Sequence, residues 1–170
     1  HVSSSYGVDF VSANKNIGGT ITPHHMLLTK DDVFKNEKIN PHHYCMPVVK
    51  NEEDLLSLRK AACFDNDKFF LGTDSAPHLT KDKIQHESLK AGIFSSPCSL
   101  ELYANIFEEE HALHNLEKFS SINGPQFYGL DINSQVLTLN KIETEVPEYT
   151  EEGNIKIKNF FAGKKINWKV

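Results

Sequence analysis

The 170-residue sequence has few cysteines, glycines and prolines: three, nine and seven, respectively. The cysteines, Cys45, Cys63 and Cys98, show no CxxC spacing. An odd number of cysteines without that spacing argues against a disulfide framework and against a structural zinc site. Free thiols of this kind are typical of a reducing compartment, so we expect a cytoplasmic protein. With 39% hydrophobic residues and little glycine or proline, the composition is that of a globular chain.

The sequence also lacks an excess of positive charge and a long apolar run. Its formal net charge is −5, and no basic stripe interleaved with aromatic residues occurs, so no nucleic-acid partner is expected. No apolar run approaches the ~20 residues that cross a bilayer, so no membrane partner is expected either. The chain opens on His1 without a signal peptide or an initiator methionine. We therefore expect a chain that is processed, tagged or cut from something longer.

Histidine, in contrast, is abundant, with nine residues in the chain. Four of them form the adjacent pairs His24-His25 and His42-His43. Successive side chains of a strand point to opposite faces, so at most one member of each pair is expected at a site. The default interpretation of these histidines, and of the remaining ones outside the motifs below, is structural or exposed.

The first 130 residues show the alternation of apolar patterns that is typical of βα units and a parallel sheet. We expect a helix over 3–13, a strand over 17–23, a helix over 51–62 capped by Asn51, and a strand from Phe69. A further helix is expected from Ser96, with Pro97 at its first position. Another is expected over 116–122, ending at Asn123-Gly124-Pro125. Glu108-Glu109-Glu110 is interpreted as a solvated face.

The pattern changes after Gly129. Residues 136–139, 155–158 and 164–170 alternate as exposed strands do, and Gly163 is well placed to turn the chain into the last of them. These segments predict a small antiparallel appendage rather than further βα units.

Two side chains of the kinds found in catalytic sites follow the strand from Phe69. Asp74 follows the apolar run, and His78 comes four residues later. Ligands of parallel sheets gather beyond the carboxyl ends of the strands, which favours a site here. The residues alone leave an alternative open, in which Asp74 caps a turn and His78 is a solvated loop residue.

Five stretches of the sequence, together with its closing run, form a distinctive set. The stretches are Thr20-Ile21-Thr22-Pro23-His24-His25, Pro41-His42-His43-Tyr44-Cys45-Met46-Pro47, Phe70-Leu71-Gly72-Thr73-Asp74-Ser75-Ala76-Pro77-His78, Phe107-Glu108-Glu109 and Ser121-Ile122-Asn123-Gly124-Pro125-Gln126-Phe127-Tyr128-Gly129-Leu130, and the closing run is Phe161 to Val170. Taken together, they resemble class II dihydroorotase of the amidohydrolase superfamily. The resemblance covers nearly the whole chain, and its GTDSAPH and NGPQFYGL runs are the specific ones.

The resemblance implies a (β/α)8 barrel with two zinc ions at the carboxyl ends of its strands. Eight βα units need ~250 residues, so the chain looks like the C-terminal part of such a barrel. Residues 1–130 would hold about its last three βα units, and 131–170 would be a C-terminal extension packing on the barrel. The family's HxH motif, its bridging carboxylated lysine and the histidine of its fifth strand have no match in the 170 residues. The remaining metal ligands are therefore expected upstream.

The resemblance also assigns roles to five residues. His1 matches a metal-ligating histidine at the end of the sixth strand, although by position alone it could be a tag remnant or a frayed end. Asp74 matches the carboxylate that touches a metal and shuttles the proton. His78 matches the residue that binds the carboxylate of dihydroorotate. Met46 and Ala91 match backbone contacts to the substrate, with one residue of alignment slack for Ala91.

The function implied is that of a dihydroorotase, which interconverts N-carbamoyl-L-aspartate and L-dihydroorotate by a metal-bound hydroxide in pyrimidine biosynthesis. The implied partners are this small-molecule substrate and a second copy of the chain in a homodimer. The segment alone is expected to be inactive. Two alternatives are another cyclic amidohydrolase, such as an allantoinase or hydantoinase, and a non-catalytic homologue that acts as an assembly partner.

Overall fold

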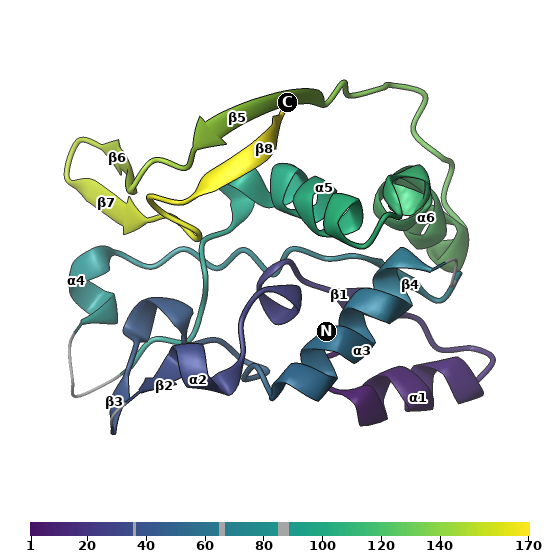
Figure 1. Ribbon diagram of the computed structural model, residues 1–170, viewed down its shortest axis with the longest axis horizontal. Helices are drawn as coiled ribbons and strands as arrows, with labels where there is room; N and C mark the ends of the chain where they lie inside the picture. The colour runs from purple at the N-terminus through teal and green to yellow at the C-terminus, as the bar shows by residue number, and fades with distance from the viewer. Residues whose placement is uncertain (36, 65–66, 85–88) are drawn as a thin grey trace.

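The computed structural model describes residues 1–35, 37–64, 67–84 and 89–170 (Figure 1). The helices are α1 (Ser5–Ala13), α2 (Lys30–Val33), α3 (Glu52–Cys63), α4 (Thr80–Lys83), α5 (Ser99–Glu109) and α6 (Asn123–Tyr128). Single helical turns of other types cover His24–Met26, Pro41–His43, Ser96–Cys98, Leu113–Asn115 and Lys118–Ile122. The strands are β1 (Gly19–Ile21), β2 (Phe34–Lys35), β3 (Lys38–Ile39), β4 (Phe69–Leu71), β5 (Asn140–Glu145), β6 (Tyr149–Glu152), β7 (Ile155–Lys158) and β8 (Lys165–Lys169).

A parallel pair of strands, β1 and β4, lies at the centre of the first 130 residues. Gly19 pairs with Phe69 and Ile21 with Leu71. The chain's first residues lie along the other side of β1, where the Val2 amide donates to the Thr20 carbonyl at 2.9 Å. Because the two strands are parallel, their carboxyl ends lie at the same edge of the sheet, where the segments after Ile21 and Leu71 begin. The predicted parallel arrangement is confirmed.

Helices α1 and α3 pack against each other beside this sheet. The predicted cap of α3 is confirmed: Asn51 Oδ1 accepts from the Asp54 amide at 3.0 Å, and the Asp54 carboxylate accepts from the Asn51 amide. Asp54 Oδ1 also accepts from the Ser5 amide at 2.8 Å, so the same carboxylate joins the start of α1 to the first turn of α3. Buried Leu58 and Ala62 of α3 contribute to one hydrophobic cluster with Phe69.

The predicted start of α5 is wrong by two residues, since Pro97 was expected at its first position. Residues Ser96–Cys98 form a 3-10 turn, and the α-helix begins at Ser99. The reason is tertiary, because the amides of Ser95 and Ser96 donate to Ser75 Oγ at 3.1 and 2.9 Å. The residue at the cap position of α5 is Cys98, so Ser96 does not cap the helix.

The predicted stop at Asn123-Gly124-Pro125 is also wrong, since the helical path runs through it to Tyr128 and ends at Gly129 in the left-handed conformation. Asn123 is buried and its Nδ2 donates to the Phe69 carbonyl at 2.9 Å. Pro125 is the third residue of α6, which follows directly on the π-helical turn Lys118–Ile122. Contact with β4 thus outweighs the local stop signal.

The C-terminal strands form two antiparallel pairs, β5 with β8 and β6 with β7. In Figure 1, β5 and β8 lie over α5, on the side away from α1 and α3. Strands β7 and β8, and the turn at Gly163 (φ +71°), agree with the prediction. The strand expected over 136–139 is wrong, because Val136 and Leu137 lie in an unpaired exposed segment before β5.

The acidic run at the end of α5 is not merely solvated. Glu108 accepts from Lys141 of β5 and from Trp168 of β8, at 2.5 and 3.0 Å. Glu109 and Glu110 both pair with Arg59 of α3, at 2.8 and 3.2 Å. The run therefore links α5 to its neighbours, with the shared Arg59 side chain only 16% exposed.

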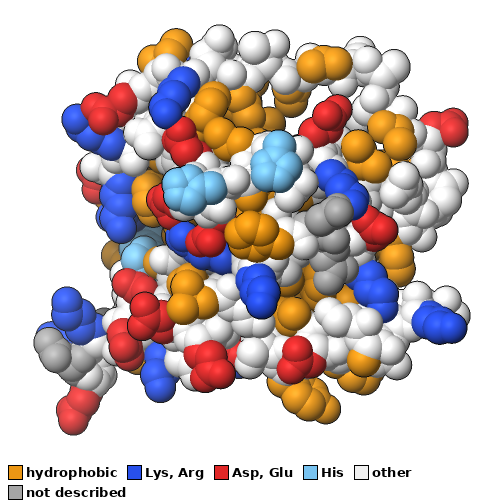
Figure 2. All heavy atoms as spheres, turned by 45° about the vertical axis from the view of Figure 1, so that its right-hand side comes forward, with side chains coloured by type: hydrophobic (Ala, Val, Ile, Leu, Met, Phe, Trp, Pro, Cys, Tyr) orange, Lys and Arg blue, Asp and Glu red, His pale blue; other side chains and the backbone are white. Residues whose placement is uncertain are grey.

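The surface carries both charges. Figure 2 shows acidic and basic side chains interspersed on the face drawn, with hydrophobic side chains reaching the surface at separate places. Among the helices of the described residues, none is long and apolar enough to cross a membrane.

Candidate active site

The edge beyond β4 brings two of the predicted site residues together. Asp74 lies three residues after the end of β4 and adopts φ +45°, a left-handed conformation that aspartate tolerates better than most residues. Its Oδ1 lies 3.6 Å from Nε2 of His1. Both side chains are about a quarter exposed, at 28% for His1 and 29% for Asp74, so the pair borders solvent without being free in it.

A threonine of β1 orients the His1 ring. The Thr20 hydroxyl lies 2.7 Å from Nδ1 of His1, which leaves Nε2 directed towards Asp74. Metal-binding histidines commonly use their second ring nitrogen in such a hydrogen bond. The sequence motif contains Thr20 but predicts no role for it, because a threonine in a strand ordinarily indicates nothing beyond β structure.

The pair of His1 and Asp74 fits a divalent metal. Two ligands on one tetrahedral zinc ion, each bonded at about 2.0–2.1 Å, lie about 3.3 Å apart. The observed 3.6 Å is close to that separation, and the donor set of one imidazole and one carboxylate suits zinc. Two ligands do not complete a site, so further ligands would be required.

The next two predicted residues also meet. His78 Nε2 lies 2.9 Å from the Ala91 carbonyl, and since a carbonyl only accepts, Nε2 carries the proton. The Ala91 segment is held against the Asp74 segment by the bridge between Ser75 and Ile93, where the Ala76 amide donates to the Ile93 carbonyl at 2.9 Å. His78 and Ala91 therefore lie in direct contact with each other beyond the end of β4.

Met46 lies on a neighbouring loop and is 58% exposed. Hydrogen bonds join this loop to the segment that follows β1 and to the segment that contains Ala91. His25 Nε2 donates to the Pro47 carbonyl at 2.8 Å, and the Gly92 amide donates to the Tyr44 carbonyl at 2.9 Å. Met46 thus lies between two anchored points, one of them next to Ala91.

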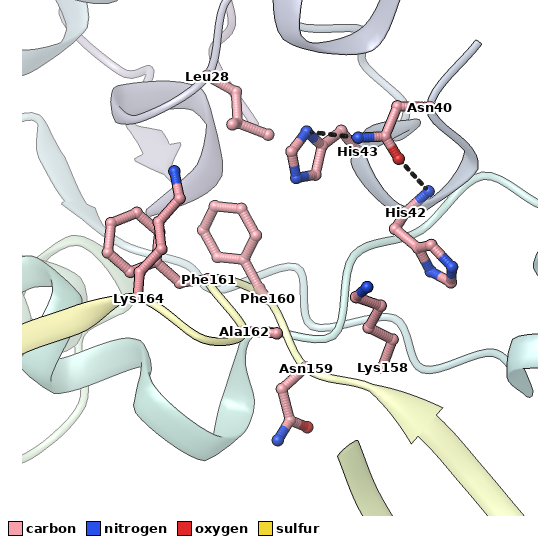
Figure 3. A pocket seen from close by; sticks show the side chains of 10 residues that line it. All are labelled: Leu28, Asn40, His42, His43, Lys158, Asn159, Phe160, Phe161, Ala162 and Lys164. Atoms are coloured by element: carbon pink, nitrogen blue, oxygen red, sulfur yellow. Dashed lines mark hydrogen bonds between the residues drawn. The ribbon is translucent and has the colours of Figure 1, made fainter. Parts of the chain in front are cut away.

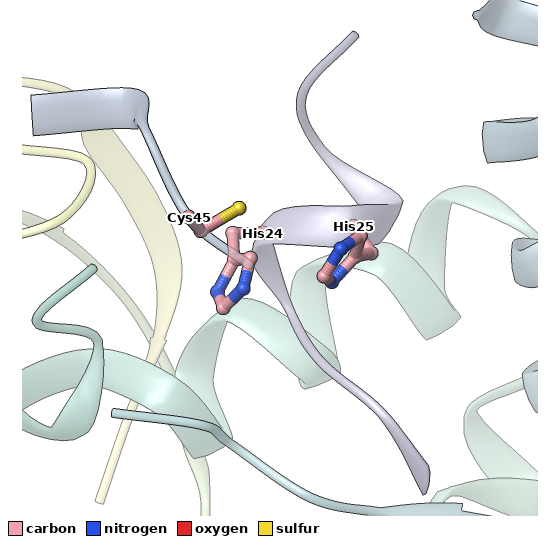
Figure 4. Close-up of side chains that lie close together, drawn as sticks. All are labelled: His24, His25 and Cys45. Atoms are coloured by element: carbon pink, nitrogen blue, oxygen red, sulfur yellow. The ribbon is translucent and has the colours of Figure 1, made fainter. Parts of the chain in front are cut away.

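A buried group of His24, His25 and Cys45 offers ligand atoms within 4.8 Å of one another (Figure 4). Both nitrogens of His25 are engaged, by Thr22 Oγ1 at 2.6 Å and by Pro47 O. Burial lowers the pKa of His24 to about 3 and that of His25 to about 4, and it raises the pKa of the Cys45 thiol to about 11. With His25 engaged, the group offers fewer ligands than the four of a structural zinc site. We interpret it as structural, as predicted.

The second histidine pair lines a cavity of about 180 Å³, drawn in Figure 3. His43 Nδ1 lies 3.1 Å from Asn40 Nδ2, and burial, together with the charges of Lys158 and Lys83, lowers the pKa of His42 to about 4. Lys158 ends β7 and Phe160 follows it in the connection to β8, so the cavity lies where this C-terminal part meets the histidine loop. None of the five predicted site residues is among those that line it.

The comparisons with known proteins agree on one family. No family model matches the sequence. The chain is 46% identical over 173 residues to a dihydroorotase of Erythrobacter litoralis and 43% identical over 171 residues to one of Coxiella burnetii. Both alignments cover 100% of this chain and 49% of the relative.

Solved structures give the same result. The dihydroorotase of Saccharomyces cerevisiae, crystallised with 5-fluoroorotic acid, matches with a TM-score of 0.88 and 34% identity, and that of Campylobacter jejuni with 0.88 and 32%. Each covers 99% of this chain and 49% of the other. A D-hydantoinase from Thermus sp. has a TM-score of 0.78 at 15% identity, which shows a shared fold only.

The parallel strands belong to part of a (β/α)8 barrel, which is the fold of the solved neighbours. Over its whole length the chain is similar to these dihydroorotases. It spans about half the length of the curated relatives it matches.

Proposed function

We propose that the protein to which this chain belongs is a dihydroorotase, which interconverts N-carbamoyl-L-aspartate and L-dihydroorotate in pyrimidine biosynthesis. The observation that carries the proposal is the contact of His1 with Asp74 beyond the strand ends, in a chain 46% identical to a dihydroorotase over its whole length. The chain alone is expected to be inactive, because it offers only part of a metal centre.

We propose a binuclear zinc centre with His1 Nε2 and Asp74 among its ligands and with the remaining ligands outside these 170 residues. Zinc bound there would supply Lewis-acid polarisation of the amide carbonyl and a lowered pKa of attacking water. Thr20 keeps the His1 ring in the orientation that such binding requires.

Asp74 is proposed to move the proton. When the ring of dihydroorotate opens, the attacking water loses a proton and the leaving amide nitrogen gains one. A carboxylate on the short segment after β4 can accept the first and deliver the second. In the cyclisation direction the same group takes the proton from the nitrogen and returns it to the departing water.

His78 is proposed to bind the carboxylate of the substrate, with the backbone of Ala91 and Met46 contacting the ring. Because Nε2 of His78 donates to the Ala91 carbonyl, Nδ1 is the ring atom left for the substrate. Nδ1 donates a hydrogen bond only when the imidazole is protonated, so a charged His78 is the form that binds an anion.

We also propose the division into a barrel portion, 1–130, and an extension, 131–170, that packs on it. Contact of β8 with α5 supports this division. A cytoplasmic homodimer is proposed as well, and the buried free thiols of Cys45, Cys63 and Cys98 are compatible with a reducing compartment.

The second candidate function is that of another cyclic amidohydrolase, such as a hydantoinase. The fold shared with the Thermus hydantoinase is compatible with it, but at 15% identity that likeness shows the fold alone, and the identity to the dihydroorotases is far higher. A non-catalytic homologue is the third candidate. The contact between His1 and Asp74 speaks against it, since a chain without catalysis has no need of that geometry.

A substrate panel tests these proposals on the complete, zinc-loaded protein. We expect the kcat/KM for dihydroorotate to exceed that for hydantoin and for allantoin by more than about a hundredfold, because a site built to bind a carboxylate discriminates against substrates that lack it. Turnover of hydantoin without turnover of dihydroorotate would support the second candidate. A loaded protein that turns over none of the three would support the non-catalytic homologue.

A further inference from the structure

A buried lysine lies beside the proposed substrate contacts and was not predicted from the sequence. Lys83, the last residue of α4, is only 3% exposed. Its Nζ donates to the carbonyls of Lys90 and Gly92, each at 2.7 Å, and to that of Tyr44 at 3.3 Å. An ammonium has three N–H groups, so these three acceptors can satisfy all of them. Burial lowers the pKa of Lys83 to about 8, so the side chain is still mostly charged at pH 7.

The three carbonyls belong to two separate segments. Lys90 and Gly92 flank Ala91, whose carbonyl accepts from His78. Tyr44 precedes the loop that carries Met46, and its carbonyl also accepts from the Gly92 amide at 2.9 Å. One side chain therefore holds the residues on both sides of Ala91 against the Met46 loop.

Gly92 shows how tightly this arrangement is packed. It adopts φ +146°, and a Cβ placed on it would lie 2.8 Å from the Ala76 carbonyl and 3.0 Å from Cδ2 of His78. Lys83 and His78 line the same small hollow, together with Gly92. A shift of the Gly92 backbone would therefore displace the His78 ring.

We propose that Lys83 is a positioning residue that fixes Ala91, and through it His78, in the place where the substrate carboxylate binds. This inference rests on the proposed function, since it presumes that His78 and Ala91 contact the substrate. Lys83 acts by holding two backbone segments together, and its charge adds positive potential next to an anionic substrate. Its loss should therefore weaken substrate binding more than it slows the chemical step.

The chain offers a matched control in Lys68, whose Nζ also donates to three backbone carbonyls. These are Val11, Ser12 and Asn14 at the end of α1, at 3.0, 2.8 and 2.6 Å. None of the three belongs to the segments of Met46, His78 or Ala91. Lys68→Met and Lys83→Met thus remove the same kind of interaction, and only the second removes it at the proposed site.

The test compares both variants with the wild type in the complete, zinc-loaded protein. For Lys83→Met we expect the KM for dihydroorotate to rise about tenfold or more with kcat changed by less than about threefold, since small displacements of binding groups have effects of this size. The Gly92 amide should exchange its hydrogen at least about tenfold faster, because its segment opens more often. Lys68→Met should keep both the KM and the Gly92 exchange within about twofold of the wild type.

The inference is overturned if Lys83→Met leaves KM and the Gly92 exchange at wild-type values, or if Lys68→Met raises KM as much. Should Lys83→Met fail to fold, Lys83→Gln keeps an N–H donor and is expected to show the same split between KM and kcat. A wild type that does not turn over dihydroorotate would contradict the proposed function instead. The exchange of Gly92 would then still decide whether Lys83 holds the segment.

Discussion

Replacing Asp74 by asparagine is expected to reduce the kcat of the complete protein about a thousandfold while leaving it folded. An amide has the shape of the carboxylate but cannot take up the proton, and a positioned acid–base group contributes about 10²–10⁴-fold to a rate. Asparagine also tolerates the left-handed conformation that Asp74 adopts, so the backbone at this position should keep its φ of +45°. The measurement is steady-state turnover of dihydroorotate, with thermal unfolding as the check on the fold.

Asp67→Asn is the matched control for this substitution. Asp67 lies before β4, its side chain is 75% exposed, and it pairs with Lys118 at 2.7 Å. Exposed pairs contribute about 0–1 kcal/mol, so we expect near-native turnover and stability. Near-native turnover of Asp74→Asn would show that the residue does not shuttle the proton.

Gly72→Ala is the second change for which we expect a large effect. A Cβ on Gly72 would lie 2.5 Å from Cβ of Thr20 and 2.8 Å from its Cγ2. Thr20 cannot move freely, because its own Cβ is fixed by the backbone of β1, which pairs with β4. We expect the free energy of unfolding to fall by about 2 kcal/mol, as overpacking in a core commonly costs 1–3 kcal/mol.

The same change should also disturb the site. Thr20 holds Nδ1 of His1, so its displacement turns Nε2 away from Asp74. We expect zinc content and turnover to fall together, measured by metal analysis and by assay of the purified complete protein. Gly153→Ala is the control for zinc content and turnover: it lies in the turn between β6 and β7, where its Cβ would meet nothing within 4 Å. Its φ of +57° strains an alanine, so a loss of stability is expected there, but zinc content and turnover should stay at wild-type values. Full zinc content and turnover in Gly72→Ala would contradict the role given to Thr20.

Much of the fold follows from local signals in the sequence. The cap at Asn51, the apolar run at Phe69 and the turn at Gly163 each stabilise the same local structure that the tertiary contacts require. Such agreement between local preference and fold makes these elements predictable. The family resemblance added what local signals do not contain, namely that the strands belong to a barrel.

The wrong predictions are those in which a distant contact opposes the local signal. Asn123 and Gly124 resemble a helix stop, but the side-chain Nδ2 of Asn123 donates to the Phe69 carbonyl and Gly124 lies against Phe70. Ser96 resembles a helix cap, but it begins a 3-10 turn whose first amide donates to Ser75 Oγ, and Cys98 takes the cap position of α5. The alternation at 136–139 suggests a strand, but no neighbouring strand pairs with it in the part of the chain that the structure describes.

Residues of the candidate site could be predicted only where the family resemblance assigned them a role. The resemblance selected His1, Asp74, His78 and Ala91, and the structure brings these residues together in two contacts. Their roles remain proposals. No sequence signal indicates Lys83, because a lysine in a polar stretch is expected at the surface and only the folded chain shows its three carbonyl acceptors.

The most direct test of the account is the position of zinc in a crystal of the complete protein soaked with dihydroorotate, located by anomalous scattering at the zinc edge. We predict a zinc ion bonded to Nε2 of His1 and to the Asp74 carboxylate, with the substrate carboxylate against His78 and Ala91. Zinc bound instead between His24 and Cys45, with His1 and Asp74 free of metal, would contradict the account.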